Sequence, residues 1–221
     1  MRPDCIIRTN RRSMSLSVSK DGKVIVRAPR KLDINKIFEF VNEKESWINK
    51  HLNAIKNTSL VNHDIKEYNV FLFLGNKYKL RQVAGIKQIE FCSNEIIYPT
   101  NWDKEILIAK MKKKYRQLAS SILNDRIEYF AKLMQLDYNT FAVRDYKARW
   151  GCCSKKLDIV INYKAIMLPH VLIDYILIHE LSHIIEFNHS SSFYKIIESV
   201  MPDWKKNRKK LKDYDFLLGL F

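Results

Sequence analysis

Apolar and polar residues alternate in the first part of the chain, as they do in a strand with one buried face. The pattern is carried by Met14, Leu16 and Val18, and it resumes over residues 24–28 after an Asp-Gly pair at residues 21–22. Two alternating runs joined by such a pair predict a β-hairpin. Further strands are expected over residues 69–74, 78–83, 86–92 and 95–98, with a turn at residues 75–76, and later over residues 140–144 and 158–162.

Other stretches have the spacing of helices. Asp33 is a suitable N-cap for the first of them, because its side chain can accept a hydrogen bond from the first turn. The helix that follows Pro169 is apolar along most of its length, which predicts that it is buried on more than one side. Four helices are expected, over residues 34–55, 104–136 and 171–187 and from about residue 192 onward.

Strands and helices are thus segregated along the chain. Strands dominate the first hundred residues apart from one helix, and helices dominate the remainder. This order predicts an α+β fold. We place a boundary near residue 100, so that residues 1–100 form a small β-rich N-terminal module with one helix and residues 101–221 form a catalytic domain.

The clearest chemical feature is the string His179-Glu180-Leu181-Ser182-His183. Two histidines four positions apart lie one above the other on a helix face, so both imidazoles can reach one ion. Glu180 lies beside them and can take a proton from water without being a ligand. The string is embedded in apolar residues, where ionisable groups need partners. The pattern predicts a zinc site with Glu180 as the general base.

A catalytic zinc site needs a third protein ligand, and two residues qualify. Glu186 lies three positions past His183, on the same helical face. His189 lies ten positions past His179 and follows Asn188, a residue that tolerates the left-handed conformation in which helices end. That turn would swing His189 towards the ion, and three histidines suit zinc. We expect His189 as the ligand and Glu186 as a group that orients a histidine, with Glu186 as the alternative third ligand.

The balance of charge is unusually basic. Lys and Arg number 39 against 24 Asp and Glu, which gives a formal net charge of +15. Such a balance favours a polyanionic partner, such as nucleic acid or nucleotide phosphates. Six basic residues gather between Lys205 and Lys212. A lysine-rich surface that serves solubility explains the same charge, so nucleic-acid binding through a basic surface is one of two interpretations.

The four cysteines suggest no disulfide framework in a chain of this length. Cys152 and Cys153 are neighbours, which disfavours a bridge between them and also a structural zinc site, whose paired ligands are usually separated by two or more residues. The N-terminus lacks the apolar segment of a secretory signal, and no run of about 18 apolar residues occurs. We therefore expect a reduced, cytoplasmic protein that does not enter a membrane.

Short motifs along nearly the whole chain are shared, in order and spacing, with one known family: Arg11-Arg12-Ser13-Met14-Ser15-Leu16, Val26-Arg27-Ala28-Pro29, Trp47-Ile48, Arg149-Trp150-Gly151-Cys152-Cys153-Ser154, Ile161-Asn162-Tyr163, His179-Glu180-Leu181-Ser182-His183, Asn188-His189-Ser190 with Phe193, and Met201-Pro202-Asp203-Trp204. Through them the chain resembles the YgjP-like metallopeptidase domain family, which is related to the SprT and WLM zincins. The resemblance implies a zincin-like core, a zinc ion on His179, His183 and His189, and Glu180 as the catalytic carboxylate. The chain departs from the family at Cys152, where serine is usual; this affects the loop and not the metal ligands.

The resemblance implies a zinc-dependent metallopeptidase that acts on peptides or proteins. Hydrolysis of nucleotide phosphoanhydrides has also been attached to the family and is the alternative, together with a nucleic-acid-associated zinc protein. Arg149, Trp150 and Gly151 precede the active-site helix in a strand–loop–strand unit. In zincins an edge strand pairs with an extended substrate, so these three residues are candidates for substrate binding. A tryptophan packed under a turn is the other interpretation of this unit.

Overall fold

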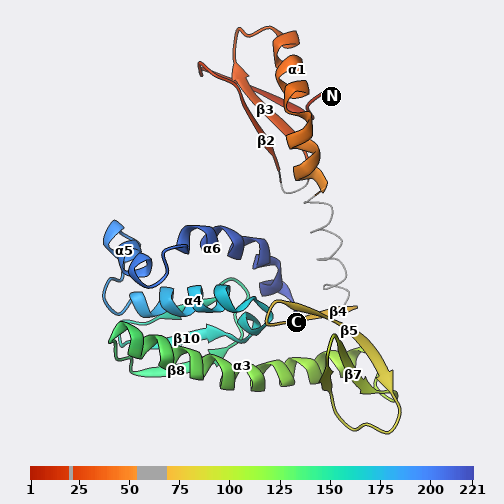
Figure 1. Ribbon diagram of the computed structural model, residues 1–221, viewed down its shortest axis with the longest axis vertical. Helices are drawn as coiled ribbons and strands as arrows, with labels where there is room; N and C mark the ends of the chain where they lie inside the picture. Colours follow the sequence, from red (N-terminus) through yellow and green to blue (C-terminus); the bar gives the residue numbers. More distant parts are fainter. Residues whose placement is uncertain (20–21, 54–68) are drawn as a thin grey trace. The chain divides into compact units, whose positions relative to one another are not determined.

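The computed structural model describes residues 1–19, 22–53 and 69–221. Contacts divide the chain into two units, Met1–Asp64 and Ile65–Phe221 (Figure 1). Both contain helices and sheets in separate segments, in agreement with the predicted α+β class. Within the described ranges, no helix combines the length and the apolar character that crossing a membrane requires.

The first unit is a three-stranded sheet covered by helix. Strands β1 (Cys5–Thr9), β2 (Ser15–Val18) and β3 (Val24–Pro29) lie in the order β1-β3-β2. The antiparallel pairing of β2 with β3 confirms the predicted hairpin, although Asp21 of its turn lies outside the described residues. Strand β1 was not expected; it pairs with β3 in parallel.

Helix α1 (Ile34–Glu43) begins where the sequence predicts, with the Asp33 side chain accepting a hydrogen bond from the Asn35 N–H. The helix is interrupted at Lys44 and resumes over residues 45–53, and the predicted end at residue 55 lies outside the described ranges. The core of this unit consists of apolar side chains from β3 and from the helical segments: Val24, Val26, Ala28, Ile37, Val41 and Ile48.

The second unit begins with a four-stranded sheet. Its strands β4 (Val70–Phe73), β5 (Asn76–Val83), β6 (Glu90–Cys92) and β7 (Glu95–Pro99) lie in the order β4-β5-β7-β6. The turn after β4 is tied to the C-terminal part of the chain, because the Leu74 N–H donates to the Ile166 carbonyl at 2.8 Å. Gly75 in this turn has φ 83°, and a Cβ there would lie 2.9 Å from Pro169.

These contacts bear on the domain boundary. The sequence placed it near residue 100, whereas by spatial contacts the chain divides after Asp64. The strands of residues 70–99 belong with the C-terminal unit, because their turn and the β4 carbonyl of Leu72, which accepts from the Tyr115 hydroxyl, are anchored there. Alternating sequence pattern identifies strands but does not show which core they join.

Two helices form the centre of this unit. Helix α3 (Lys104–Met134) buries a residue at every fourth position along most of its length: Leu107, Met111, Tyr115, Ala119, Leu123 and Ile127. Helix α4 (His170–Ser182) is apolar on all sides because it packs against α3, α5 (Ser191–Val200) and α6 (Trp204–Leu211) as well as against strands. Figure 1 shows α4 between α3 and α6.

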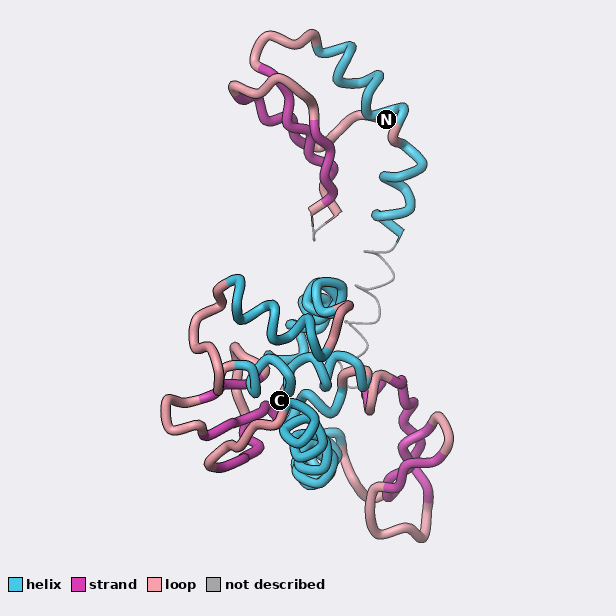
Figure 2. Tube along the Cα trace, turned by 60° about the vertical axis from the view of Figure 1, so that its left-hand side comes forward, coloured by secondary structure: helices cyan, strands magenta, loops and turns pink. Residues whose placement is uncertain are grey.

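A second sheet supports α4. Strands β8 (Thr140–Arg144), β9 (Gly151–Cys153) and β10 (Asp158–Asn162) lie in the order β8-β10-β9, with β9 antiparallel to β10. Figure 2 shows this sheet and the four-stranded sheet as separate groups of strands with helices between them. The sequence predicted β8 and β10 with a loop between them; the loop contains the short edge strand β9, which contacts α4.

A buried lysine ties the C-terminal segment to the rest of the unit. Lys164 lies in the 3₁₀ helix η1 (Tyr163–Met167) and is 1% exposed. Its Nζ donates to the Leu218 carbonyl at 2.8 Å and lies 3.1 Å from Asp145 Oδ1. Leu218 belongs to the 3₁₀ helix η2 (Lys212–Gly219), so the hydrogen bond from Lys164 holds this C-terminal segment in place, while the ion pair with Asp145 compensates the buried charge.

The same pair sets the ionisation of Asp145. Burial acts to raise the pKa of this carboxyl group. The hydrogen bond and charge of Lys164, with the charge of Lys112, outweigh burial and hold the pKa below its ordinary value of 3.8.

We expect Asp145→Asn to lower the free energy of unfolding by about 2 kcal/mol at pH 7, because it leaves the Lys164 ammonium buried without its carboxylate. The folded-state pKa of Asp145 lies below its ordinary value of 3.8, so its stabilisation is complete above pH 3.8 and is lost as the pH falls further. Urea unfolding of wild type and variant over a pH series measures the difference, which should shrink below about pH 4. A difference that stays constant in acid would contradict this role.

Candidate metal centre

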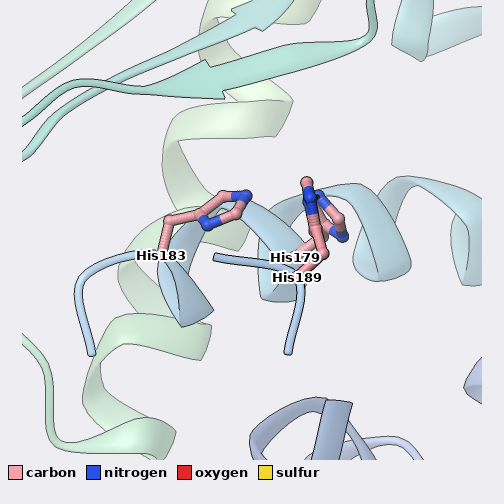
Figure 3. A group of neighbouring side chains, drawn as sticks. All are labelled: His179, His183 and His189. Atoms are coloured by element: carbon pink, nitrogen blue, oxygen red, sulfur yellow. Dashed lines mark hydrogen bonds between the residues drawn. The ribbon is translucent and has the colours of Figure 1, made fainter. Parts of the chain in front are cut away.

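The three histidines predicted as ligands come from the end of α4 and the loop that follows it (Figure 3). His179 lies in the last turn of α4, His183 is its C-cap residue, and His189 lies just before α5. One ring nitrogen from each lies within 4.8 Å of the others. The Nε2 atoms of His179 and His189 are 3.1 Å apart. The structure therefore brings all three candidate ligands to one point.

The chain reaches this arrangement by a different turn from the one expected. Helix α4 ends at Ser182 and not at residue 187. The Ile184 N–H donates to the Leu181 carbonyl at 3.0 Å, a bond over three residues that tightens the turn. Asn188 is not among the described residues with positive φ, so the expected left-handed helix end is wrong. Its N–H donates instead to the Glu186 carboxylate, at 3.0 Å.

Glu186 contacts the histidine loop through its carboxylate and its backbone carbonyl. Its carboxylate accepts from the Asn188 N–H and so shapes the loop that carries His189. Its backbone carbonyl lies 3.2 Å from His183 Nδ1. Because a carbonyl can only accept, the proton of a neutral His183 belongs on Nδ1. The lone pair is then on Nε2, where it is available to an ion. Among the described residues, the Glu186 carboxylate is not part of the group of close ligand atoms that His179, His183 and His189 form.

One buried aromatic ring contacts all three imidazoles. Phe193 in α5 has no exposed surface, and its ring centroid lies 4.9, 4.6 and 4.9 Å from those of His179, His183 and His189. The ring is held by the start of α5, where the Ser190 hydroxyl accepts from the Phe193 N–H at 3.2 Å. The N-cap beside His189 thus also places the ring that orients the histidines.

Burial keeps the two helix histidines neutral. It lowers the pKa of His179 to about 3, with further lowering by the charges of His183 and His189. It also lowers the pKa of His183. Neutral imidazole is the form that binds metal ions. Near pH 7, protons therefore do not compete for the ring nitrogens of these two side chains.

The donor set fits zinc. Two nitrogens bound to a tetrahedral zinc at about 2.0–2.1 Å lie about 3.3 Å from each other, close to the 3.1 Å between His179 Nε2 and His189 Nε2. Three imidazoles are borderline-soft ligands, which zinc accepts readily. Three protein ligands also leave the fourth position open, as catalytic sites require.

Glu180 lies beside this group and is 6% exposed. Burial raises the pKa of its carboxyl group to about 8, and the positive charge of Arg149 opposes the rise. Strand β9 packs directly on the carboxyl group: a Cβ at Gly151 would lie 2.8 Å from Glu180 Oε1. Gly151, predicted as a substrate-binding residue, therefore touches the predicted base.

Arg149 and Trp150 form the segment that leads into β9. Asn162 holds this segment by donating from Nδ2 to the Arg149 carbonyl at 3.0 Å. The Arg149 guanidinium lies over the Tyr146 ring at 5.2 Å and is exposed. Trp150 is 8% exposed, and its Nε1 donates to Asp215 Oδ1 at 3.1 Å. It is thus a packed tryptophan with one polar bond to η2.

Cys153, in the same strand β9, carries a thiol that is not suited to bind a metal ion or to attack a substrate. Burial raises the pKa of Cys153 to about 11, with smaller contributions from the charges of Glu180 and Cys152. A thiol with this pKa stays protonated at neutral pH, whereas metal binding and nucleophilic attack need the thiolate.

A cavity of about 280 Å³ opens beside His179 and Glu180. One wall is α4, including Tyr175, and a second is β9 with Trp150. The third wall comes from α6 and η2, which the sequence did not connect with the site: Arg208, Leu211, Lys212 and Asp215. Arg208 was visible in the sequence only as part of a basic run.

The model of one metallopeptidase family matches most of the chain. The model of the family described as YgjP-like, metallopeptidase domain, matches residues 12–214. Comparison with curated proteins gives no match. Among solved structures, the chain is similar to the crystal structure of the metallopeptidase zymogen of Pyrococcus abyssi abylysin, with 26% identity over 41% of this chain and 91% of that chain. The TM-score of 0.38 is too low to indicate a shared fold.

The third ligand can be tested by substitution. We expect His189→Ala to abolish tight zinc binding, because it removes a ligand. Glu186→Ala should weaken binding only about 10- to 100-fold, since it disturbs the loop around the ligands. Competition with a chromophoric chelator measures both affinities. His170→Ala, at the first residue of α4, is the matched control and should bind zinc as wild type does. Loss of zinc in Glu186→Ala with retention in His189→Ala would reverse the assignment.

Proposed function

We propose that this chain, which belongs to the YgjP-like metallopeptidase domain family, is a zinc-dependent peptidase with a zincin-like core and α4 as its HExxH helix. The observation that carries the proposal is the meeting of three imidazoles beside one buried carboxyl group. Membership of a metallopeptidase family supports peptides or proteins as substrates.

In this proposal His179, His183 and His189 hold the zinc ion. When bound, zinc supplies a Lewis acid that polarises a carbonyl group and lowers the pKa of water. The protein's contribution is to present three lone pairs at one point: burial keeps His179 and His183 uncharged, and the Glu186 carbonyl fixes the tautomer of His183. Phe193 prevents the rings from turning away.

Glu180 is the proposed general base. It accepts a proton from the attacking water and passes it to the leaving amine. When no metal ion is bound, the pKa of about 8 keeps most Glu180 carboxyl groups protonated at pH 7, despite the positive charge of Arg149. A positive charge beside it favours the carboxylate. Proton acceptance by Glu180 is therefore coupled to occupation of the histidine site.

Strand β9 is the proposed binding edge for the peptide. It lies at the end of the order β8-β10-β9, so one of its edges has no strand partner in the described sheet. An extended peptide can add to such an edge by main-chain hydrogen bonds. Gly151 would place that peptide next to Glu180, because only a residue without a side chain allows the carboxyl group to lie so close. Arg149 and Trp150 flank the same edge.

Other expectations stay predictions. Nucleotide phosphoanhydrides would use the same zinc ion and the same base, so they remain the alternative substrate class. Nucleic-acid binding through the basic surface and a cytoplasmic location likewise rest on the sequence alone.

The role of Glu180 can be separated from metal binding. Glu180→Gln keeps the shape of the side chain but removes its ability to accept a proton. We expect it to bind one zinc ion per chain, as wild type does, and to lose about 10²- to 10⁴-fold in peptide hydrolysis. Elemental analysis and turnover of casein-derived peptides measure the two properties, with nucleoside triphosphates assayed in parallel. An unchanged rate in zinc-loaded Glu180→Gln would refute the assignment of the base.

Gly151→Ala tests the contact between β9 and Glu180. The added methyl group would lie 2.8 Å from Oε1, so the carboxyl group must move. A displacement of about 1 Å can cost about 10²-fold in rate, and we expect a loss of that order with zinc affinity unchanged. Gly219→Ala is the control, since a Cβ there meets nothing within 4 Å. Equal rates in wild type and Gly151→Ala would show that β9 does not position the base.

A further inference from the structure

The cavity beside Glu180 has a basic wall. Arg208 and Lys212 line it from α6 and η2, opposite the α4 side that carries His179 and Glu180. Its volume of about 280 Å³ lies just below the range of about 300–1,000 Å³ for pockets that take whole small ligands. The cavity therefore suits one side chain or one chain end of a larger substrate and is small for a nucleotide.

Arg208 is held in this wall by aromatic rings. Its guanidinium carbon lies 5.2 Å from the Tyr194 ring centroid, and Tyr194 in turn stacks on the buried Trp204 at 4.4 Å. In the described part of the chain, Arg208 has no carboxylate within ion-pair distance. Stacking on a ring leaves the edge of a guanidinium free to donate hydrogen bonds to an anion.

Lys212 and Asp215 are the other charged residues in this wall of the cavity. Lys212 also lacks a carboxylate at ion-pair distance among the described residues. Asp215 is the one carboxylate on this side, and its Oδ1 already accepts from Trp150 Nε1 at 3.1 Å. From this wall, two cations that form no ion pair among the described residues face the cavity, together with one carboxylate that is bonded across it; Glu180 faces them from α4. The wall is suited to a ligand with negative charge.

We propose that this cavity is a specificity pocket that binds a carboxylate of the peptide substrate, with Arg208 as the main recognition residue and Lys212 as its support. The inference rests on the proposed peptidase function and adds the class of substrate. The carboxylate belongs either to an aspartate or glutamate next to the scissile bond or to the C-terminus of the peptide. Both would place the anion beside the scissile bond, since the same cavity is lined by Glu180 and His179.

The experiment uses the zinc-loaded full chain and a pool of random-sequence peptides, prepared once as free acids and once as C-terminal amides. Mass spectrometry identifies the cleavage sites. We expect aspartate and glutamate to be enriched at one position beside the cleaved bond in both pools, or cleavage at a fixed distance from the free C-terminus that disappears in the amide pool. The first result assigns the pocket to a side chain and the second to the chain end.

Matched variants then test the residues. Arg208→Gln should reduce the preference for a carboxylate peptide over its amide counterpart about five- to tenfold, measured as the ratio of the two kcat/KM values. Lys209→Gln removes the same charge from the same helix but does not line the cavity, and it should keep the wild-type preference. Lys212→Gln, with Lys210→Gln as its control, provides a second pair if Arg208→Gln does not fold.

The outcomes distinguish the two levels of the proposal. Peptide cleavage that depends on Glu180 but shows no preference for a carboxylate would overturn the pocket alone. An equal loss of preference in Arg208→Gln and Lys209→Gln would also overturn it, since the effect would then be one of net charge. Absence of any peptide cleavage, with or without hydrolysis of nucleoside triphosphates, would overturn both the peptidase function and the pocket.

Discussion

The packing of Phe193 against three imidazoles is the contact on which the rest of the site depends. One ring with no exposed surface touches the side chains of His179, His183 and His189, which come from a helix and from the loop after it. This is possible because α4 ends at Ser182 and α5 begins at Ser191, with only its N-cap Ser190 between the helix and His189. Close packing of this kind leaves each imidazole few alternative orientations, so the ligand atoms face one another before any ion is present.

The same physical cause prepares the ligands and the base. The second half of helix α4 lies inside the unit, so the side chains of His179 and Glu180 are largely removed from water. Loss of hydration disfavours charge, which keeps His179 neutral and raises the pKa of Glu180 to about 8. In an apolar helix these groups are costly without a partner. In the proposed site, one cation would offset the cost of burying both groups, because it would bind the neutral imidazoles and stabilise the Glu180 carboxylate. In the proposed function, binding of the metal and activation of the base are therefore linked by burial.

Much of the site could be predicted from local sequence, and the rest depends on contacts between distant segments. The helical repeat alone predicts that His179 and His183 share one face of a helix. The need for a third protein ligand at a catalytic zinc site singled out His189. The early end of α4 could not be predicted, because it depends on bonds over three residues that no residue type specifies. The division after Asp64 and the basic wall of the cavity were also missed. Arg208 joins the site only through the packing of α6 on α4, which a pattern of lysines and arginines does not reveal.

In the proposed site, the three histidines hold one zinc ion with an open position beside Glu180. Crystals of the zinc-loaded full chain, measured at the zinc absorption edge, test it most directly through the anomalous difference map. The account predicts a single peak about 2.0–2.1 Å from one nitrogen of each histidine, with no protein atom at the fourth position. A peak that is bound by the Glu186 carboxylate in place of His189, or that is closed by a fourth protein ligand, would contradict it.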